Sequence, residues 1–474
     1  ALNLSTLTSP ATSGEVLAEV LTTADFLEPV PVLRNLARGS NKGGDAEQSV
    51  ALNQPKALPL IDGDGYLYCP VATSNYANVE DPIIPATADF DLSIEFIVAK
   101  FASGSGYSHI LGQYQGGANG RIHFGFYDHQ KRLYFFCGGD GTNPNVDIKT
   151  DIDAIVEGQR HTARVTRVGN TFTLYLDGVL QQTTTSGVAT LQTVGTQIGW
   201  GNLRGLNGAI FSVTEGSNTN VDFTSPNVRH GATKFECATG QVVTINQSGQ
   251  NPASIIKKPI LRFDGVDDFM DGVFGQTVTG GYMFAAFSVL GDGGEDTSRI
   301  FSINTTGGSD GDYQGAIFSL RNNSVPNDLF SYQAGWILGH SQMFDNDNGD
   351  LLHESLIKNG TQKSLVNNAG LTNSTVTASN ISSEEFNIVS NATGLNNAAI
   401  DLEYLALFPA SITDSQADAV RNYINNRNNV FDLKDGFGYY FYDPQSLSSG
   451  AVTSWNGRII GSDNGDVDKL ATQA

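Results

Sequence analysis

Short acidic loops are the first residues in this chain whose types suit a chemical task. One stretch places carboxylates at Asp345, Asp347 and Asp350, with Asn and Gly between them. Calcium takes about six to eight oxygen ligands, so this loop is a candidate calcium site. It does not complete an EF-hand, because position five is Gly349 and position twelve is Leu356. The same residue types form turns without any ion. We therefore predict that no cofactor is required and that calcium is an optional ligand.

Aromatic residues beside amide and charged groups are the second candidate chemistry, because sugars are commonly bound against an exposed ring. Tyr107 and Tyr114 flank one loop, and two tryptophans offer larger rings. Each of these rings could instead pack against its own domain or a subunit, since aromatic side chains also dominate cores and interfaces. The predicted carbohydrate-binding residues are Trp200, Asn202, Arg204 and Trp336.

Glycoside hydrolysis would need two carboxyl groups on either side of one sugar bond. The nearest pair is Asp401 and Glu403, which would share one face of a strand, and we interpret them as two outward carboxylates of a structural strand. The sequence has no Gly-x-Ser-x-Gly, His-Glu-x-x-His or phosphate-loop motif, and its 7 histidines are scattered. We therefore predict that the protein is not an enzyme.

The charge balance excludes several partners. The 474 residues include 49 acidic and 27 basic ones, for a net charge of -22. Such a field repels nucleic acid and anionic lipid, and no apolar run approaches the roughly 20 residues that cross a bilayer. We predict neither nucleic-acid binding nor membrane insertion. The 3 cysteines are widely spaced, and the chain starts without a basic or apolar signal segment. We therefore expect folding in a reducing cytoplasm.

Alternating apolar and polar residues predict that most of the chain is β-structure. Leu92–Val98, Ile122–Tyr127 and Leu133–Phe136 alternate with a period of two. Thr162–Val168 and Thr171–Leu176 are separated by Gly169-Asn170, which suits a two-residue hairpin loop. Many short strands with close turns favour an antiparallel sandwich of two sheets.

Similar landmarks occur twice, about 190 residues apart, which predicts two copies of one domain. We pair His161 with His353, each at the start of a strand. The paired segments are Ile61–Leu67 with Phe263–Met270, Phe90–Ile97 with Tyr282–Val289, and Ser108–Leu111 with Ser298–Phe301.

The first 57 residues have too few apolar residues for a core of their own. They contain an apolar stripe at helical spacing after Ser13, a plausible N-cap. We therefore predict a short helix in an arm that docks on a partner. The predicted docking residues are Val16, Leu17, Val20, Leu21 and Phe26.

The remaining boundaries follow from the strand patterns and one capped helix. Thr413 and Gln416 form a capping box at the start of a predicted helix, 413–427. The expected domains are an N-terminal arm (1–57), a first sandwich (58–215), a linker (216–259), a second sandwich with the helix (260–432) and a tail (433–474).

Three of these features resemble the laminin-G-like, or concanavalin-A-like, jelly rolls. They are the opening segment Phe263–Phe269, the hairpin 162–176 followed by Asp177-Gly178-Val179, and the helix Thr413–Arg427 after the last strand. The resemblance implies an all-β fold of two tandem antiparallel jelly-roll sandwiches, with a short N-terminal arm and one C-terminal helix. It says little about function, because one fold hosts many functions.

A narrower resemblance concerns paired jelly rolls in fibre and decoration proteins of tailed bacteriophages. The segments Val221–Asn227 and Thr239–Asn246 look like the inter-domain stretch of such proteins. This implies a structural virion protein, made in the host cytoplasm, that docks on capsid or tail proteins through its arm and contacts a host surface glycan. We expect a homo-oligomer, a trimer. The alternatives are a bacterial extracellular lectin or adhesin, and a polysaccharide-degrading enzyme.

Overall fold

A computed structural model gives the structure of the chain. It describes residues 15–17, 32–33, 46–50, 54–70, 75–102, 106–114, 121–138, 146–187, 191, 194–199, 205–247, 251–278, 281–294, 298–303, 317–321, 328–333, 336–340, 351–358, 361–366, 369–373, 383–390, 397–408, 413–415, 417–418, 421, 441–442, 454–459 and 467–472. The chain forms two compact units, one of Leu60–Lys258 and one of Ala1–Pro59 with Pro259–Ala474.

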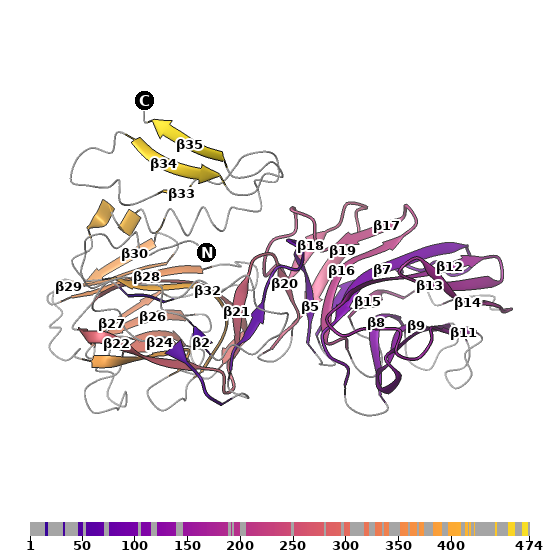
Figure 1. The fold of residues 1–474 in the computed structure, drawn as a ribbon, viewed down its shortest axis with the longest axis horizontal. Helices are drawn as coiled ribbons and strands as arrows, with labels where there is room; N and C mark the ends of the chain where they lie inside the picture. Colours follow the sequence, from indigo (N-terminus) through magenta and orange to yellow (C-terminus); the bar gives the residue numbers. More distant parts are fainter. Residues whose placement is uncertain are drawn as a thin grey trace. The chain divides into compact units, whose positions relative to one another are not determined.

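The first unit is an antiparallel sandwich of two sheets (Figure 1). One sheet has the order β14-β13-β12-β7-β16-β5-β20, with β17 also paired to β16, and the other has the order β11-β10-β9-β8-β15-β6-β19-β18. The strands are β5 (Tyr66–Cys69), β6 (Tyr76–Val79), β7 (Phe90–Val98), β8 (Tyr107–Gln113), β9 (Ile122–Tyr127), β10 (Arg132–Cys137), β11 (Val146–Lys149), β12 (Arg160–Val168), β13 (Thr171–Leu176), β14 (Val179–Thr185), β15 (Thr196–Ile198), β16 (Gly208–Glu215), β17 (Thr219–Asp222), β18 (Lys234–Glu236), β19 (Val242–Asn246) and β20 (Ser254–Ile256).

The core of this sandwich lies between its sheets and follows from the period-two alternation. In β7, Phe90, Leu92, Ile94 and Phe96 are buried, whereas the residues between them are only partly buried. The hairpin of β12 and β13 turns at Gly169, whose φ of 59° suits a residue without a β-carbon. The predicted strands and hairpin of this region are therefore confirmed.

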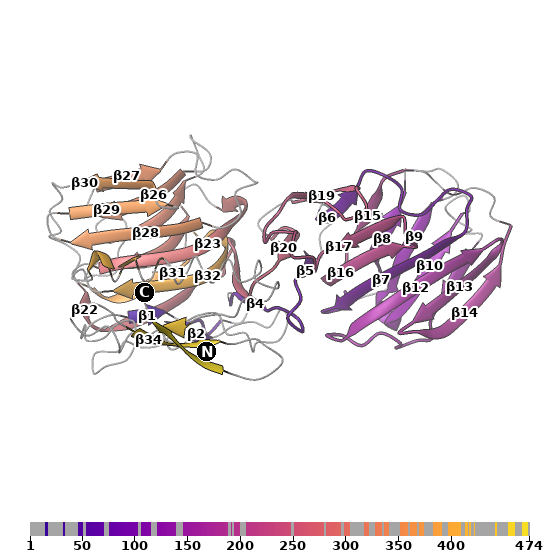
Figure 2. The same cartoon turned by 90° about the horizontal axis from the view of Figure 1, so that it is seen from above.

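The second unit repeats this architecture (Figure 2). Its sheets have the orders β30-β29-β28-β23-β32-β21-β4, with β1 also paired to β32, and β2-β3-β22-β31-β24-β25-β26-β27. The strands are β1 (Glu15–Leu17), β2 (Val32–Leu33), β3 (Ala46–Glu47), β4 (Lys56–Leu58), β21 (Ile260–Asp264), β22 (Met270–Val278), β23 (Gly281–Gly294), β24 (Arg299–Ile303), β25 (Ile317–Arg321), β26 (Asp328–Gln333), β27 (Trp336–His340), β28 (Leu351–Lys358), β29 (Thr361–Val366), β30 (Ala369–Asn373), β31 (Ser383–Ile388) and β32 (Ala398–Phe408). All-β tandem sandwiches are thus confirmed.

The predicted N-terminal helix is wrong where the structure describes it. Glu15–Leu17 is the strand β1, and it pairs antiparallel with Leu405–Leu407 of β32. The indigo N-terminal strands β1 and β2 lie among the orange strands of the second sandwich (Figures 1 and 2). The described strands β1–β4 therefore join the two sheets of the second sandwich in their own chain. In β1 this long-range pairing overrode the apolar spacing.

The predicted linker also belongs to a sandwich. Residues 216–259 contribute β17, β18, β19 and β20, all paired with strands of the first unit. Sequence analysis read this segment as a linker because strands of three to five residues give almost no periodic signal.

The strand ladders place the internal repeat in a different register from the predicted one. Phe211 and Glu403 each form the extra residue of a bulge, opposite β7 and β23 respectively, so these bulges are equivalent. When the two bulges are aligned, Phe96 corresponds to Phe287, whereas the predicted ranges match Phe96 with Ser288. His353 pairs with Ala285, and so it corresponds to Ala163, two residues beyond His161.

The opening landmarks are misaligned, and another pair is correct. Ile61–Leu67 precedes and enters β5, whereas Phe263–Met270 begins at the end of β21 and leads into β22. The pairing of Ser108–Leu111 with Ser298–Phe301 holds. Residues 109 and 299 occupy matching bridges to Gly205 and Asn397.

Beyond the last sandwich strand the structure describes a few helical residues and a small sheet. Asp414, Ser415, Ala417, Asp418 and Arg421 are helical within the predicted helix 413–427. The strands β33 (Phe441–Tyr442), β34 (Ser454–Ile459) and β35 (Val467–Thr472) form an antiparallel sheet. Within the described ranges, no helix has the length and hydropathy that crossing a bilayer would take.

Candidate functional site

Most predicted site residues lie outside the part of the chain that the structure describes. This holds for Trp200, Asn202 and Arg204, for Asp345, Asp347 and Asp350, and for Val20, Leu21 and Phe26. Trp336 is the first residue of β27, and Val16 and Leu17 lie in β1.

The strands β8, β9 and β10 carry a cluster of rings on the face that points away from the core. Alternate residues of these strands fill the core, among them Phe124, Phe126 and Leu133. The residues between them form what we call the Tyr–His face, which consists of Tyr107, His109, His123, Tyr127, Tyr134 and Phe136. Of these, Tyr107 is exposed, with 37% of its surface accessible, and Tyr127 and Phe136 are half-buried.

Gly125 opens the space in which the central rings meet. It lies opposite His109 of β8 on one side and Tyr134 of β10 on the other. A β-carbon at Gly125 would lie 2.1 Å from the carbonyl oxygen of Ser108. Because this position has no side chain, the hydroxyl of Tyr134 reaches the His109 Nε2 atom across it, at 2.8 Å.

The rings of the Tyr–His face form a continuous layer. Tyr127 lies 4.8 Å from both Tyr107 and Tyr134, measured between ring centroids. Tyr134 stacks on Phe136 at 5.4 Å, and Phe136 stacks on His123 at 4.5 Å. Contacts at these distances favour ring packing by about 0.5–1.5 kcal/mol each beyond the burial of area. Tyr134 and both histidines are buried, so the layer is accessible only at Tyr107 and in part at Tyr127 and Phe136.

His123 gives this surface a neutral polar group. Its Nδ1 atom lies 3.2 Å from the Nε2 atom of His109. Burial, with His109 and Arg121 nearby, lowers the pKa of His123 to about 3, so the imidazole is uncharged at neutral pH. The side chain is only 3% exposed, and its Nε2 atom has no hydrogen-bond partner among the described residues. A buried polar atom without a partner is uncommon in proteins and calls for an explanation.

Charged side chains lie at the edge of the face. Lys149 of β11 forms an ion pair with Asp147 and lies over the ring of Tyr127, 5.2 Å from its centroid. Arg121 lies over the ring of Tyr114 at 5.8 Å. Asp128 is buried and accepts a hydrogen bond from the Ser108 hydroxyl at 3.0 Å. The face thus combines rings with carboxylate and cationic groups, a combination suited to ligands that have both C–H and O–H surfaces.

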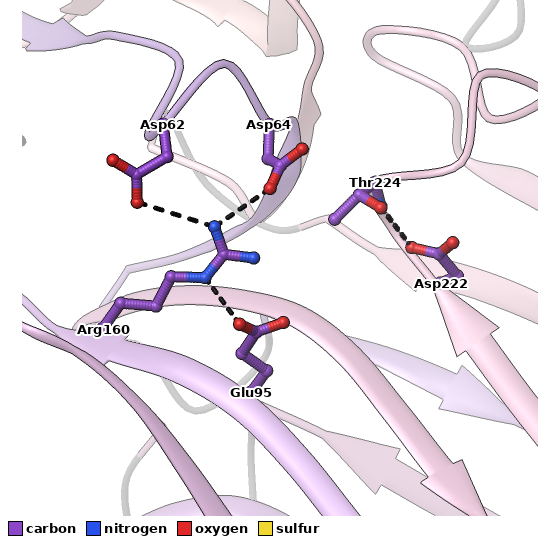
Figure 3. Close-up of polar contacts among 6 residues, drawn as sticks. All are labelled: Asp62, Asp64, Glu95, Arg160, Asp222 and Thr224. Carbon is purple, nitrogen blue, oxygen red and sulfur yellow. Dashed lines mark hydrogen bonds and ion pairs between the residues drawn. The ribbon is translucent and has the colours of Figure 1, made fainter. Parts of the chain in front are cut away.

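The opposite sheet carries a different cluster on its outer face, centred on Arg160 (Figure 3). The guanidinium group of Arg160 contacts Glu95 at 2.7 Å, Asp64 at 3.0 Å and Asp62 at 3.7 Å. It also lies over the ring of Phe211, 3.8 Å from the centroid. Asp62 and Asp64 belong to a short acidic loop whose residue types would also suit calcium. Here an arginine supplies the positive charge, so these carboxylates serve as ion-pair partners.

Figure 3 also shows a turn stabilised by its own side chains. Asp222, at the end of β17, accepts hydrogen bonds from the Thr224 backbone N–H at 2.8 Å and from its hydroxyl at 2.6 Å. This is a local turn of the kind that Asp residues form without an ion.

A second group of carboxylates lies in the second unit, and no arginine is recorded as its ion-pair partner among the residues that the structure describes. The carboxylate oxygens of Asp264, Asp267 and Asp268 lie within 4.8 Å of one another. Burial, with Asp264 nearby, raises the pKa of Asp268 to about 7. Asp268 also accepts a hydrogen bond from the Asp264 backbone N–H at 3.0 Å. The group therefore stabilises a loop, and the mutual repulsion of its charges is relieved when Asp268 binds a proton.

The carboxylates considered for catalysis are buried. The guanidinium of Arg262 bonds both oxygens of Asp401 at 2.7 Å, and the two side chains are each 2% exposed. Glu403 is buried as well. The prediction of two outward carboxylates is therefore wrong about their environment, because the face of β32 that carries them is covered. Asp401 is held in an ion pair and is not free to transfer a proton.

The sequence pattern places several of these rings on one side of their strands, but it does not show that they contact one another. The alternation in 122–127 and 133–136 already places His123, Gly125 and Tyr127 on one side, and Tyr134 and Phe136 likewise on one side of their strand. Tyr107 was considered as a ring beside a loop. The contact between the two histidines depends on how β8 pairs with β9, which periodicity does not specify.

Comparisons with known proteins do not assign this chain to a family. No protein-family model matches the chain, and no curated protein matches it. Among solved structures, it is similar to domains LG4-5 of the mouse laminin α1 chain, with 10% identity, a TM-score of 0.29, and coverage of 74% of this chain and 91% of that one. It is also similar to a putative carbohydrate-binding protein from Bacteroides ovatus, with 11% identity, a TM-score of 0.29, and coverage of 42% and 61%.

A third similar structure is the CBM40 module of a Ruminococcus gnavus IT-sialidase bound to α2,3-sialyllactose. The identity is 12%, the TM-score is 0.24, and the match covers 31% of this chain and 89% of that one. Identities and TM-scores this low carry no argument about function. What this chain does is therefore inferred from its own side chains.

Proposed function

We propose that this chain is a non-enzymatic carbohydrate-binding protein and that the Tyr–His face is its glycan-binding surface. The observation that carries the proposal is the layer of rings that runs from exposed Tyr107 to buried His123. Tyrosine has an apolar ring and a polar hydroxyl, so it can stack on the C–H face of a sugar and still bond its hydroxyls.

The polar groups of the face support the same class of ligand. The ion pair of Asp147 with Lys149, beside Tyr127, offers both donors and acceptors to hydroxyl groups. The net charge of -22 disfavours approach of polyanionic chains. The proposed ligand is therefore a neutral glycan.

Catalysis is not part of the proposal. On the described part of this face, Asp128 is buried against Ser108 and Asp147 is paired with Lys149. Neither carboxylate is placed as a proton donor opposite a nucleophile or base, which glycoside hydrolysis requires.

Glycan-array binding followed by calorimetry tests the proposal. Tyr107→Ala should weaken binding of the array hit by about tenfold or more, which corresponds to about 1.4 kcal/mol. The matched control is Tyr175→Ala, which removes a half-buried tyrosine from the outer face of the opposite sheet, where it lies near Arg164. The proposal fails if the full chain binds no glycan, or if the two variants weaken binding equally.

The virion role stays a prediction. None of the structures described above is a phage protein, and the expectation of a trimer on a phage particle rests on the sequence resemblance alone. Glycan binding does not require a phage particle, and it supports the alternative of an extracellular lectin or adhesin.

A further inference from the structure

Exposed apolar side chains of the first unit lie mostly at one end of its sandwich. This is the end at which β8, β12 and β14 begin and β9, β11 and β13 end. Five of the six large apolar residues that are exposed in the described part of this unit lie there, and Val168 lies at the opposite end. The five are Tyr107, Ile152, Val156, Val179 and Leu180. Scattered apolar residues are normal on a surface, whereas a group of them indicates a binding surface.

This end of the sandwich adjoins the accessible part of the Tyr–His face. Tyr107 lies opposite Tyr127 where β8 pairs with β9. The turn that follows Tyr127 is bonded to the β11–β12 loop, residues 150–159, because the Asp153 N–H donates to the carbonyl of Gln130 at 2.8 Å. The β11–β12 loop carries two of the exposed apolar residues. The aromatic surface therefore continues into an aliphatic one at its accessible end.

The β11–β12 loop has a defined shape, so its aliphatic residues have a defined position. Ile155 anchors the loop, since its side chain is buried. The next backbone N–H, that of Val156, donates to the Nε2 atom of His161 at 3.2 Å. On this frame Ile152 is 59% exposed and Val156 is 52% exposed. The loop thus presents two aliphatic side chains beside the rings and not among them.

The charges of the β11–β12 loop limit what can lie on it. Its three charged residues, Asp151, Asp153 and Glu157, are acidic and exposed. Lys131 of the neighbouring turn forms an ion pair with Glu157 at 3.5 Å, which leaves the two aspartates as excess negative charge. A phosphate or carboxylate next to an apolar group of the ligand would be repelled there.

We infer that the glycan bound by the Tyr–His face carries an uncharged apolar chain at one end, as a neutral glycolipid does, and that Ile152 and Val156 bind the start of that chain. The inference rests on the proposed function, because the sugar must lie against Tyr107 and Tyr127. The aliphatic residues follow the rings at one end of the face. The apolar part of the ligand therefore belongs at the end of the sugar chain and not along it.

The experiment compares the methyl and octyl glycosides of the glycan-array hit by calorimetry on the full chain, below the micelle concentration. Each methylene group that is fully buried strengthens binding by about fourfold. The octyl glycoside should therefore bind at least about tenfold more tightly than the methyl glycoside, since burial of about two methylene groups suffices. Ile152→Ser should reduce this ratio to about threefold or less. The matched control, Val168→Ser, removes an exposed valine from the opposite end and should keep the full ratio.

The other outcomes overturn the inference, and they separate it from the proposed function. If the two glycosides bind the natural chain equally, the inference fails and the glycan site stands. If Ile152→Ser and Val168→Ser reduce the ratio equally, the alkyl chain does not lie on the β11–β12 loop. If octyl glycosides of sugars that the array does not select bind as tightly, the alkyl chain adheres without the sugar and the inference is refuted. If neither glycoside of the hit binds, the proposed function fails together with the inference.

Discussion

Leu58→Ala should destabilise the second sandwich even though Leu58 lies directly before the first sandwich in the sequence. Leu58 is completely buried in β4 and is opposite Ile260 of β21. Removing a buried leucine side chain costs about 2–5 kcal/mol, because it loses contacts and leaves a cavity. A cost of about 3 kcal/mol corresponds to a change of roughly 150-fold in the equilibrium between closed and open states.

Hydrogen exchange with mass spectrometry can assign this loss to one unit. Backbone amides of β21, β23 and β32 should exchange up to about 150-fold faster in Leu58→Ala, if they open together with the second sandwich. Amides of β7, β12 and β16 should be unchanged. The matched variant is Ile256→Ala in β20, which lies just before the second sandwich in sequence but pairs with Tyr66 of the first.

Ile256→Ala should therefore give the reverse pattern. Backbone amides of the first sandwich should exchange faster, and those of the second sandwich should exchange at the rate of the natural chain. The reasoning is refuted if each variant instead weakens the sandwich that follows it in the sequence. It is also refuted if Leu58→Ala leaves β21 as protected as in the natural chain.

Three further predictions concern single positions. Gly125→Ala should destabilise the first unit by more than about 1 kcal/mol in urea unfolding, because its β-carbon would lie 2.1 Å from a backbone oxygen of β8, whereas Gly187→Ala has open space and should be neutral. Arg262→Ala should cost about 3–5 kcal/mol, since it leaves the carboxylate of Asp401 buried without its cation, and replacing both residues by leucine should recover most of this loss. Burial raises the pKa of Asp268 from 3.8 to about 7, so its contribution to stability is fully present below about pH 4 and is lost as pH rises to about 7. Asp268→Asn should abolish this decline between about pH 4 and pH 7 in urea unfolding, and an unchanged decline would contradict the prediction.

Period-two patterns predicted the parts of the fold that are fixed locally. The alternation in β7 and the Gly169-Asn170 loop between β12 and β13 require only neighbouring residues, and both are observed. The same rule places His123, Gly125 and Tyr127 on one face of β9. Together with Tyr134 and Phe136 of β10, this makes four of the six residues of the Tyr–His face accessible from the sequence alone.

What the sequence did not show depends on partners that are distant along the chain. Residues 15–17 have helical spacing of apolar neighbours, but they lie in a strand because β32 offers a free edge about 390 residues later. The bulges at Phe211 and Glu403 leave no mark in composition, and a shift of one residue reverses which side chains face the core. For that reason the repeat was recognised while its register was misplaced.

The position of β1–β4 at the start of the chain has a consequence for the order of events during synthesis. The first sandwich has all its strands once the ribosome has made Ile256, and so it can close early. The strands β1–β4 are made first of all, but their partner β32 ends at Phe408, about 350 residues after Leu58. At about 5–20 residues per second, they wait roughly 20–70 s without a sheet to join. The strands that are made first are therefore among the last to gain a complete sheet.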